Sequence, residues 1–252
     1  MRFAVQLYTV RDLAKTDFAA TVAEVARIGY AGVELAGYGN LASARDVRKA
    51  CDDSGLAICG AHVGLEAMEK DLGRVIEDQH ILGNKTLVCP YLAEPRRKDA
   101  AGYRQVAGSL NRIAAEAKKA GLDFAYHNHA FEFQFFDGQT GMDILYGQTD
   151  PDLVKAELDV YWLAEGGVDP VAYVKRMGRR VALLHLKDRE IGPDGKARFA
   201  PVGSGNIDMA AIIAAGDAAG VAWGIVEEDQ TYGRPPMDDL RTSFVNLQKL
   251  TA

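Results

Sequence analysis

The amino-acid sequence predicts an α/β fold, a single (β/α)8 TIM barrel that residues 1–252 form as one domain. Short apolar runs alternate eight times with longer amphipathic segments, and such alternation gives parallel strands joined by right-handed crossovers. A length of 252 residues is typical of this barrel. A doubly wound sheet is the competing fold, but no GxGxxG motif follows an early strand, which favours the barrel.

The first half of the chain contains five of the expected strands. Phe18 and Val22 recur at helical spacing and define the first helix, for which Thr16 is the expected N-cap and Gly29 the end. The other elements are delimited in the same way, by apolar runs and by glycines that stop helices. The expected strands are 3–7, 32–35, 57–62, 86–89 and 121–125, and the helices are 17–28, 43–54, 66–82 and 100–120.

The second half is less regular. Pro170 suits the first turn of a helix, and Asp208 is the expected N-cap of another. Residues 187–206 are rich in glycine and proline and are predicted to form a long polar loop. The expected strands are 154–159, 181–186 and 223–227, and the helices are 141–146, 170–177, 209–219 and 237–250.

The composition excludes several classes of partner. A net charge of -6 argues against nucleic acid, because phosphate binding requires a basic face. No signal-peptide pattern and no apolar run of membrane-spanning length is present. Cys51, Cys59 and Cys89 are odd in number and lie in helix- or strand-like stretches, which predicts reduced thiols in a cytoplasmic protein. Arginine-rich helices offer polar interfaces, so we expect a homodimer.

The most informative local pattern is Tyr-His-Asn-His-Ala-Phe-Glu-Phe at 126–133. It holds two of the five histidines of the chain. Residues of a strand alternate between faces, so His127 and His129 share a face, with Glu132 nearby. Two imidazoles and a carboxylate suit a divalent metal or a proton relay. The alternative is a pair of buried histidines satisfied by hydrogen bonds.

Polar residues close seven of the eight expected strands. In a TIM barrel, catalytic groups come from the carboxyl ends of the strands, so these side chains are expected to converge. Asp159, His185 and Glu227 would form a mixed oxygen and nitrogen ligand set that suits Mn²⁺, Mg²⁺, Co²⁺ or Zn²⁺. Such a metal polarises a carbonyl, and a carboxylate such as Glu227 can take a proton from the adjacent carbon.

Other polar or aromatic residues near these strand ends are expected to contact a substrate. They are Gln6, Glu34, His62, His129 and Trp162. Lys187 shares the face of His185 and could hold an enediolate charge, or it could pair with Asp188 or Glu190. Glu34 could instead be a second acid/base or the partner of an arginine. Gly203-Ser204-Gly205 could cradle a phosphate, or simply allow a helix to begin.

The chain resembles the sugar phosphate isomerase/epimerase superfamily with its xylose-isomerase-like barrel. The resemblance covers nearly the whole chain and rests on residues 126–133, Leu-Asp at 158–159, His-Leu-Lys-Asp at 185–188, Pro-Val-Gly-Ser-Gly-Asn-Ile-Asp at 201–208 and Val-Glu at 226–227. It implies a divalent metal held by acidic and histidine ligands, to which Asp159, His185 and Glu227 correspond.

The fourth ligand departs from the pattern of ketose 3-epimerases, which carry a glutamate on strand five. His127 stands at that place here and resembles the branch of inosose dehydratases and proteins that cleave keto-glycosides by elimination. Either His127 is the ligand and Glu132 an acid/base, or Glu132 is the ligand and His127 supports it. Trp162 replaces a histidine that follows the strand-six aspartate in ketose epimerases.

The predicted function is therefore metal-dependent removal of a proton next to a carbonyl of a sugar, keto-sugar or cyclitol. Isomerisation, epimerisation and elimination share this step, with Glu132, Glu227 and Lys187 as the expected catalytic residues. A metal-dependent nuclease with the same barrel is disfavoured by the net charge of -6 and the scarcity of histidine. A sugar-binding barrel without catalytic activity is the alternative from another class.

Overall fold

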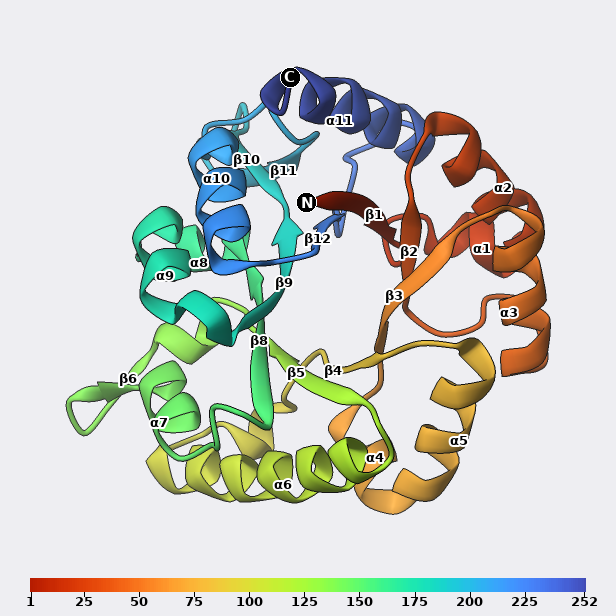
Figure 1. The fold of residues 1–252 in the computed structure, drawn as a ribbon. Helices are drawn as coiled ribbons and strands as arrows, with labels where there is room; N and C mark the ends of the chain where they lie inside the picture. The colour runs from red at the N-terminus through yellow and green to blue at the C-terminus, as the bar shows by residue number, and fades with distance from the viewer.

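The computed structural model describes residues 1–252 and contains a closed barrel of parallel strands surrounded by helices (Figure 1). The predicted TIM barrel is thereby confirmed. The first strand pairs with both the second and the last, which closes the ring. In chain order the barrel strands are β1 (Arg2–Gln6), β2 (Gly32–Leu35), β3 (Ala57–His62), β4 (Thr86–Cys89), β5 (Asp123–His127), β8 (Val154–Asp159), β9 (Val181–Leu186) and β12 (Trp223–Val226).

The helices form an outer ring because each presents an apolar stripe to the barrel (Figure 1). They are α1 (Arg11–Thr16), α2 (Phe18–Ile28), α3 (Ala44–Asp53), α4 (Leu65–Lys70), α5 (Leu72–Leu82), α6 (Ala100–Lys119), α7 (Gly141–Gly147), α8 (Val160–Glu165), α9 (Pro170–Met177), α10 (Met209–Ala219) and α11 (Pro236–Leu250). Short 3-10 turns are η1 (Glu94–Arg96), η2 (Phe131–Phe133) and η3 (Gly178–Arg180). None of the helices is long and apolar enough to cross a membrane.

Two of the expected helices begin at other residues than predicted, because an aspartate caps each observed helix. Asp17, not Thr16, caps α2, because its carboxylate accepts a hydrogen bond from the backbone N–H of Ala20 at 2.9 Å. Thr16 instead ends a separate helix, α1, which the sequence reasoning missed. Asp71 likewise caps α5 through the N–H of Arg74, so the single helix expected at 66–82 is two helices.

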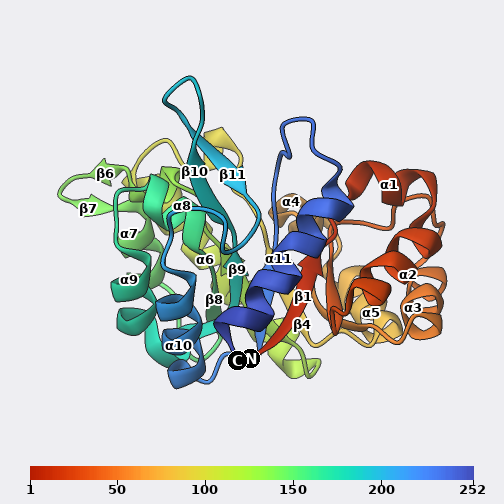
Figure 2. The same ribbon diagram turned by 90° about the horizontal axis from the view of Figure 1, so that it is seen from above.

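The prediction that residues 187–206 form a loop is also wrong in part. It contains an antiparallel hairpin, β10 (Asp188–Ile191) with β11 (Ala197–Ala200), which stands beyond the end of the barrel in Figure 2. A smaller hairpin, β6 (Phe135–Phe136) with β7 (Gln139–Thr140), follows η2. Both lie in segments rich in glycine and charge, where alternation of apolar residues is too short to reveal a strand.

The interior of the barrel is filled by a small apolar cluster of seven residues that includes Leu183, Trp223 and Ile225. Toward the carboxyl ends of the strands, the side chains inside the barrel are polar. Figure 2 shows the β10–β11 hairpin at the opposite end of the barrel from the two chain termini. The apolar cluster thus supports a layer of polar residues from below.

Candidate active site

A cavity of about 440 Å³ opens at the carboxyl ends of the strands. Residues at the end of, or shortly after, every barrel strand except β8 line it. They are Tyr8, Ala36, His62, Pro90, Tyr91, His127, His129, Lys187, Glu227 and Asp229. Asp159 and His185 have no exposed surface and are contacted by these lining residues from above. The structure therefore brings together most of the polar residues that the sequence placed at strand ends.

His127, Asp159, His185 and Glu227 form a group whose potential ligand atoms all lie within 4.8 Å of one another. The register of the barrel produces this arrangement, since Asp159 on β8 pairs directly with His185 on β9. Nδ1 of His185 lies 2.9 Å from Oε2 of Glu227 and 3.9 Å from Oδ2 of Asp159. Nε2 of His127 lies 3.8 Å from the same Asp159 oxygen.

This group fits a divalent metal ion. Two imidazoles and two carboxylates are a ligand set that Mn²⁺, Co²⁺ and Zn²⁺ accept. Oδ2 of Asp159 is fully buried and has no hydrogen-bond partner, although the ammonium of Lys187 lies 2.9 Å away. We regard that contact as an ion pair without hydrogen-bond geometry. This oxygen therefore has no hydrogen bond to lose if a metal ion takes the place of the ammonium.

A second pair of carboxylates lies below the two imidazoles. Oε2 of Glu157 lies 3.0 Å from Nδ1 of His127, and Oε2 of Glu34 lies 2.7 Å from Nε2 of His185. Each imidazole thus points one nitrogen toward Asp159 and the other at a carboxylate below. In metalloproteins such carboxylates fix the orientation of histidine ligands.

The sequence reasoning missed Glu157. The signal was available, because Glu157 lies two residues before Asp159 on the same strand and so faces the same side of β8.

His62 and Gln6 hold the two lower carboxylates together. Nε2 of His62 lies 2.8 Å from Glu157 and 3.1 Å from Glu34, and the amide of Gln6 donates to Glu34 at 2.8 Å. Of the residues expected to contact substrate, His62 lines the cavity, whereas Gln6 and Glu34 have no exposed surface. Glu34 is neither a free acid/base nor an arginine partner, since its neighbours are His62, His185 and Gln6.

The four histidines of the site fall into two groups, two with a raised pKa and two with a lowered pKa. Burial alone would lower the pKa of His62, but Glu34 and Glu157 raise it to about 10. The pKa of His185 is likewise raised well above its ordinary value by Glu157 and Glu34. Burial dominates for the other two, lowering the pKa of His127 to about 3 and of His129 to about 2. His127 and His129 are therefore neutral in the metal-free protein, whereas His185 carries a proton that it would have to release in order to bind a metal.

The carboxylates Asp159 and Glu227 also have pKa values shifted in opposite directions. Burial raises the pKa of Asp159 to about 6, although Lys187 and His185 oppose the rise. For Glu227, the attraction of Lys187 and His185 outweighs burial and holds its pKa well below the ordinary value. Glu227, which lines the cavity, is therefore ionised at neutral pH and can accept a proton.

Lys187 is almost fully buried and surrounded by carboxylates. Its ammonium lies 2.9 Å from Asp159, 2.8 Å from Glu227 and 2.8 Å from Asp229. The alternative pairing with Asp188 or Glu190 does not occur. The rings of Trp162 and Phe199 lie 5.6 and 5.5 Å from the ammonium and complete its surroundings.

Glu132 is not brought into the cavity. Its carboxylate accepts hydrogen bonds from the hydroxyl of Tyr126 and from the backbone N–H of His129, the latter at 2.8 Å. Burial raises its pKa to about 8. The side chain therefore holds the turn that carries His129, and neither the metal group nor the cavity lining includes it.

Aromatic side chains frame the mouth of the cavity. Tyr8 and Tyr91 line it and are 43% and 47% exposed, so each offers a ring to a ligand. His129 stacks on Phe131 and lies 5.4 Å from Trp162. Trp162 itself does not line the cavity; its backbone N–H donates to Asp159 at the start of α8. Such rings suit the apolar faces of a sugar or cyclitol.

The glycines suggested as a phosphate cradle bind the carboxylate of Asp188 instead. Backbone N–H groups of Gly203 and Gly205 each donate to Oδ2 of Asp188 at 2.9 Å. Those of Arg189 and Ile207 donate to Oδ1 of the same carboxylate. The prediction of a phosphate site here is therefore wrong, because Asp188 occupies the place of the ligand.

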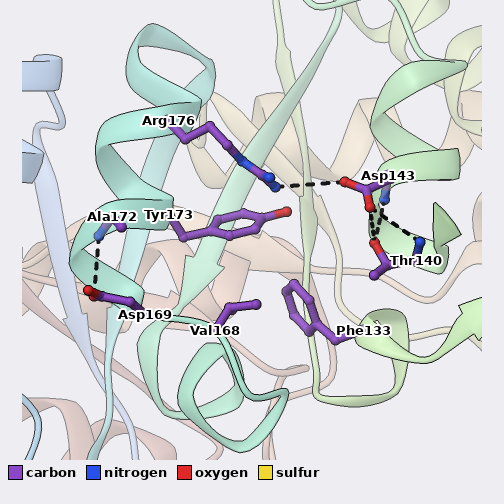
Figure 3. A pocket seen from close by; sticks show the side chains of 8 residues that line it. All are labelled: Phe133, Thr140, Asp143, Val168, Asp169, Ala172, Tyr173 and Arg176. Atoms are coloured by element: carbon purple, nitrogen blue, oxygen red, sulfur yellow. Dashed lines mark hydrogen bonds and ion pairs between the residues drawn. The ribbon is translucent and has the colours of Figure 1, made fainter. Parts of the chain in front are cut away.

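Figure 3 shows a separate cavity of about 220 Å³ among η2, α7 and α9. Its polar groups serve the helices that enclose it. Asp143 completes the capping box of α7 and lies 3.8 Å from Arg176, and Asp169 caps α9. The carboxylates that line it are therefore used in helix caps and an ion pair, whereas the residues expected to be functional line the cavity at the strand ends.

Comparisons with known proteins identify the family to which the chain is similar. The family model described as xylose isomerase-like TIM barrel matches residues 22–249. The chain is 29% identical over 136 residues to an inosose dehydratase of Geobacillus thermodenitrificans (strain NG80-2), covering 48% of this chain and 45% of that protein. An inosose dehydratase of Geobacillus kaustophilus (strain HTA426) is 31% identical over 86 residues, covering 34% and 27%. The chain thus matches less than half the length of these curated relatives.

Among solved structures, the chain is similar to a sugar phosphate isomerase/epimerase from Parabacteroides distasonis ATCC 8503. The TM-score is 0.85 with 26% sequence identity, and the match covers 98% of this chain and 93% of that one.

Proposed function

Since the chain belongs to the xylose isomerase-like TIM barrel family, we propose that it is a metal-dependent enzyme that removes a proton next to a carbonyl of a sugar, keto-sugar or cyclitol. One observation carries the proposal. His127, Asp159, His185 and Glu227 converge beside a 440 Å³ cavity that also presents an ionised carboxylate, an ammonium and two exposed tyrosine rings.

His127, Asp159, His185 and Glu227 would hold the metal. When bound there, a divalent ion would polarise the substrate carbonyl and so acidify the neighbouring C–H bond. Tyr8 and Tyr91 would bind the apolar faces of the ring, and His129, which also lines the cavity, would contact a hydroxyl.

The proton chemistry falls to the charged residues of the cavity. Glu227 would accept the proton, and the electron pair of the broken C–H bond would move toward the carbonyl oxygen. Lys187 would stabilise the negative charge that develops on that oxygen. The electron pair would then return from that oxygen to form a carbon–carbon double bond while the C–O bond to a hydroxyl on the next carbon breaks. His62 carries a proton because of its raised pKa and would donate it to the departing hydroxyl, which leaves as water.

Two observations favour dehydration or elimination as the outcome. The curated relatives are inosose dehydratases. Glu132, which the sequence predicted as a second catalytic carboxylate beside Glu227, is hydrogen-bonded to Tyr126 and His129 and does not line the cavity. A carboxylate on one side and a protonated imidazole on the other suits removal of a proton followed by loss of an oxygen. Epimerisation would need two similar bases facing one carbon.

The test is incubation with keto-sugars, keto-glycosides and inososes in D₂O with Mn²⁺ or Co²⁺. We expect deuterium at the carbon next to the carbonyl for at least one of them, and its product identifies the reaction. A protein that binds metal and a sugar but exchanges no proton would be a sugar-binding barrel instead. Asp159→Ala should lose bound metal in elemental analysis while the barrel stays folded, because residues at this end serve function more than stability.

A further inference from the structure

Lys187 contacts the same atoms that the proposed metal would need. Its ammonium lies 2.9 Å from Oδ2 of Asp159 and 2.8 Å from Oε2 of Glu227. The same two oxygens lie 3.9 and 2.9 Å from Nδ1 of His185. A carboxylate oxygen that binds a cation this closely is not free to bind a second one at full strength, because the two cations repel each other.

The third contact of Lys187 lies outside the metal group. Oδ1 of Asp229 is 2.8 Å from the ammonium, and the Asp229 side chain is 26% exposed at the cavity. Asp229 is not part of the group formed by His127, Asp159, His185 and Glu227. An ammonium that left Asp159 and Glu227 would therefore still have a carboxylate partner, in Asp229, which lines the cavity.

We propose that the ammonium of Lys187 and a divalent cation exchange at Asp159 and Glu227, and that Asp229 retains the ammonium after the exchange. The inference rests on the proposed metal site and adds a role for two residues of this chain. Lys187 neutralises the buried carboxylates in the metal-free protein. After exchange it stays beside Asp229 and faces the substrate, so that metal binding and presentation of the ammonium are linked.

The exchange predicts opposite effects of two substitutions on Mn²⁺ affinity, measured by titration calorimetry and elemental analysis. Lys187→Met removes the competing cation, so Mn²⁺ should bind at least about tenfold more tightly. Asp229→Asn removes the carboxylate that receives the displaced ammonium, so Mn²⁺ should bind several-fold more weakly. Lys187→Gln provides a second neutral variant, and circular dichroism checks that each variant is folded.

A double-mutant cycle separates exchange from simple charge effects. If Asp229 acts by receiving the ammonium, Asp229→Asn should have almost no effect in the Lys187→Met background. An equal loss of affinity in both backgrounds would show that Asp229 acts only as a nearby negative charge, and would overturn the proposal. Lys196→Met removes an exposed lysine and serves as the matched control, for which Mn²⁺ affinity should not change.

The failure of this inference is distinguishable from that of the metal site. If the wild-type protein binds Mn²⁺ and Lys187→Met binds it no more tightly, the exchange is wrong and the metal site remains. If only Lys187→Met and Lys187→Gln take up Mn²⁺, Lys187 excludes the metal from the wild-type site, and both the exchange and the metal-dependent function are overturned. If no variant binds Mn²⁺, both the metal site and the exchange are rejected.

Discussion

Glu157 and Glu34 each use one carboxylate oxygen to contact more than one histidine or amide. Such carboxylates decide which nitrogen of an imidazole carries a proton and which is left to face the cavity. Their own second oxygens, Oε1 in both cases, are buried without hydrogen-bond partners. The layer below the proposed metal site is therefore held by a few atoms, and loss of one should disturb several histidines together.

Glu157→Gln tests this layer. The amide cannot supply the negative charge that His62 and His127 now face, so both rings should lose their fixed orientation. We expect the affinity for Mn²⁺ to fall by about 10- to 100-fold, while the substrate cavity itself is unchanged. Glu94→Gln, at an exposed glutamate of η1, is the control. Calorimetric titration of both variants provides the measurement, and equal affinities would refute the positioning role.

The raised pKa of Glu132 predicts that the stability of the protein depends on pH. Burial raises its pKa to about 8 from an ordinary value of 4.5, so the folded protein keeps a proton that the unfolded chain releases. The resulting stabilisation is complete below pH 4.5 and is lost as the pH rises through about 8. Glu132→Gln cannot ionise, so its melting temperature should fall less than that of the wild type between pH 6 and 9. Parallel melting profiles would contradict this assignment.

At the scale of elements, Asp188 joins the β10–β11 hairpin to the segment before α10. One carboxylate accepts hydrogen bonds from four backbone N–H groups, those of Arg189, Gly203, Gly205 and Ile207. A Cβ atom at Gly205 would lie 2.4 Å from this carboxylate, which explains why glycine is required there. The hairpin and the following loop thus form one unit around a buried charge.

Asp188→Ala should loosen this unit. Each buried N–H left without an acceptor costs about 1–3 kcal/mol, although water will reach some of them. We expect a lower free energy of unfolding and faster amide exchange at Gly203 and Gly205, with exchange in the barrel strands unchanged. Chemical denaturation and hydrogen exchange measure the two effects. Asp194→Ala, at the exposed tip of the same hairpin, should change neither.

The sequence predicted the bounds of seven elements correctly. The residue ranges of β2, β3, β4, β8, β9, α9 and α10 match the expected ranges. It failed where a single side chain decides the outcome. Asp71 divides one periodic segment into two helices, and α8 begins directly after β8 because the Asp159 carboxylate accepts the N–H of Trp162. Periodicity alone carries no information about such caps.

The same limit applies to the site. Convergence of Asp159, His185 and Glu227 followed from barrel closure and required no side-chain detail. The contacts of Lys187 and Glu132 could not be predicted, because both depend on which way a long side chain turns. Lys187 turns inward to three carboxylates, and Glu132 turns back to Tyr126. Strand parity fixes a face, but not the path of a flexible side chain.

At the scale of the whole molecule, we predict association of the chain into a homodimer or a larger assembly. The arginine-rich outer helices offer polar surfaces for it, and barrels of this kind often pair. Light scattering at micromolar concentration should give a mass of at least twice the 27.3 kDa of one chain. A particle of 27.3 kDa at that concentration would rule the assembly out.

Closure of the barrel by β1 and β12 also governs how the protein is made. Val5 pairs with Val226, and the cavity combines Tyr8 with Glu227 and Asp229. Until β12 has left the ribosome, β1 and β9 each keep an unpaired edge, and unpaired edges invite aggregation. Joining residues so distant in sequence is also slow. The cavity can therefore form only after β12 has been synthesised, and a nascent chain has to be kept from aggregating until then.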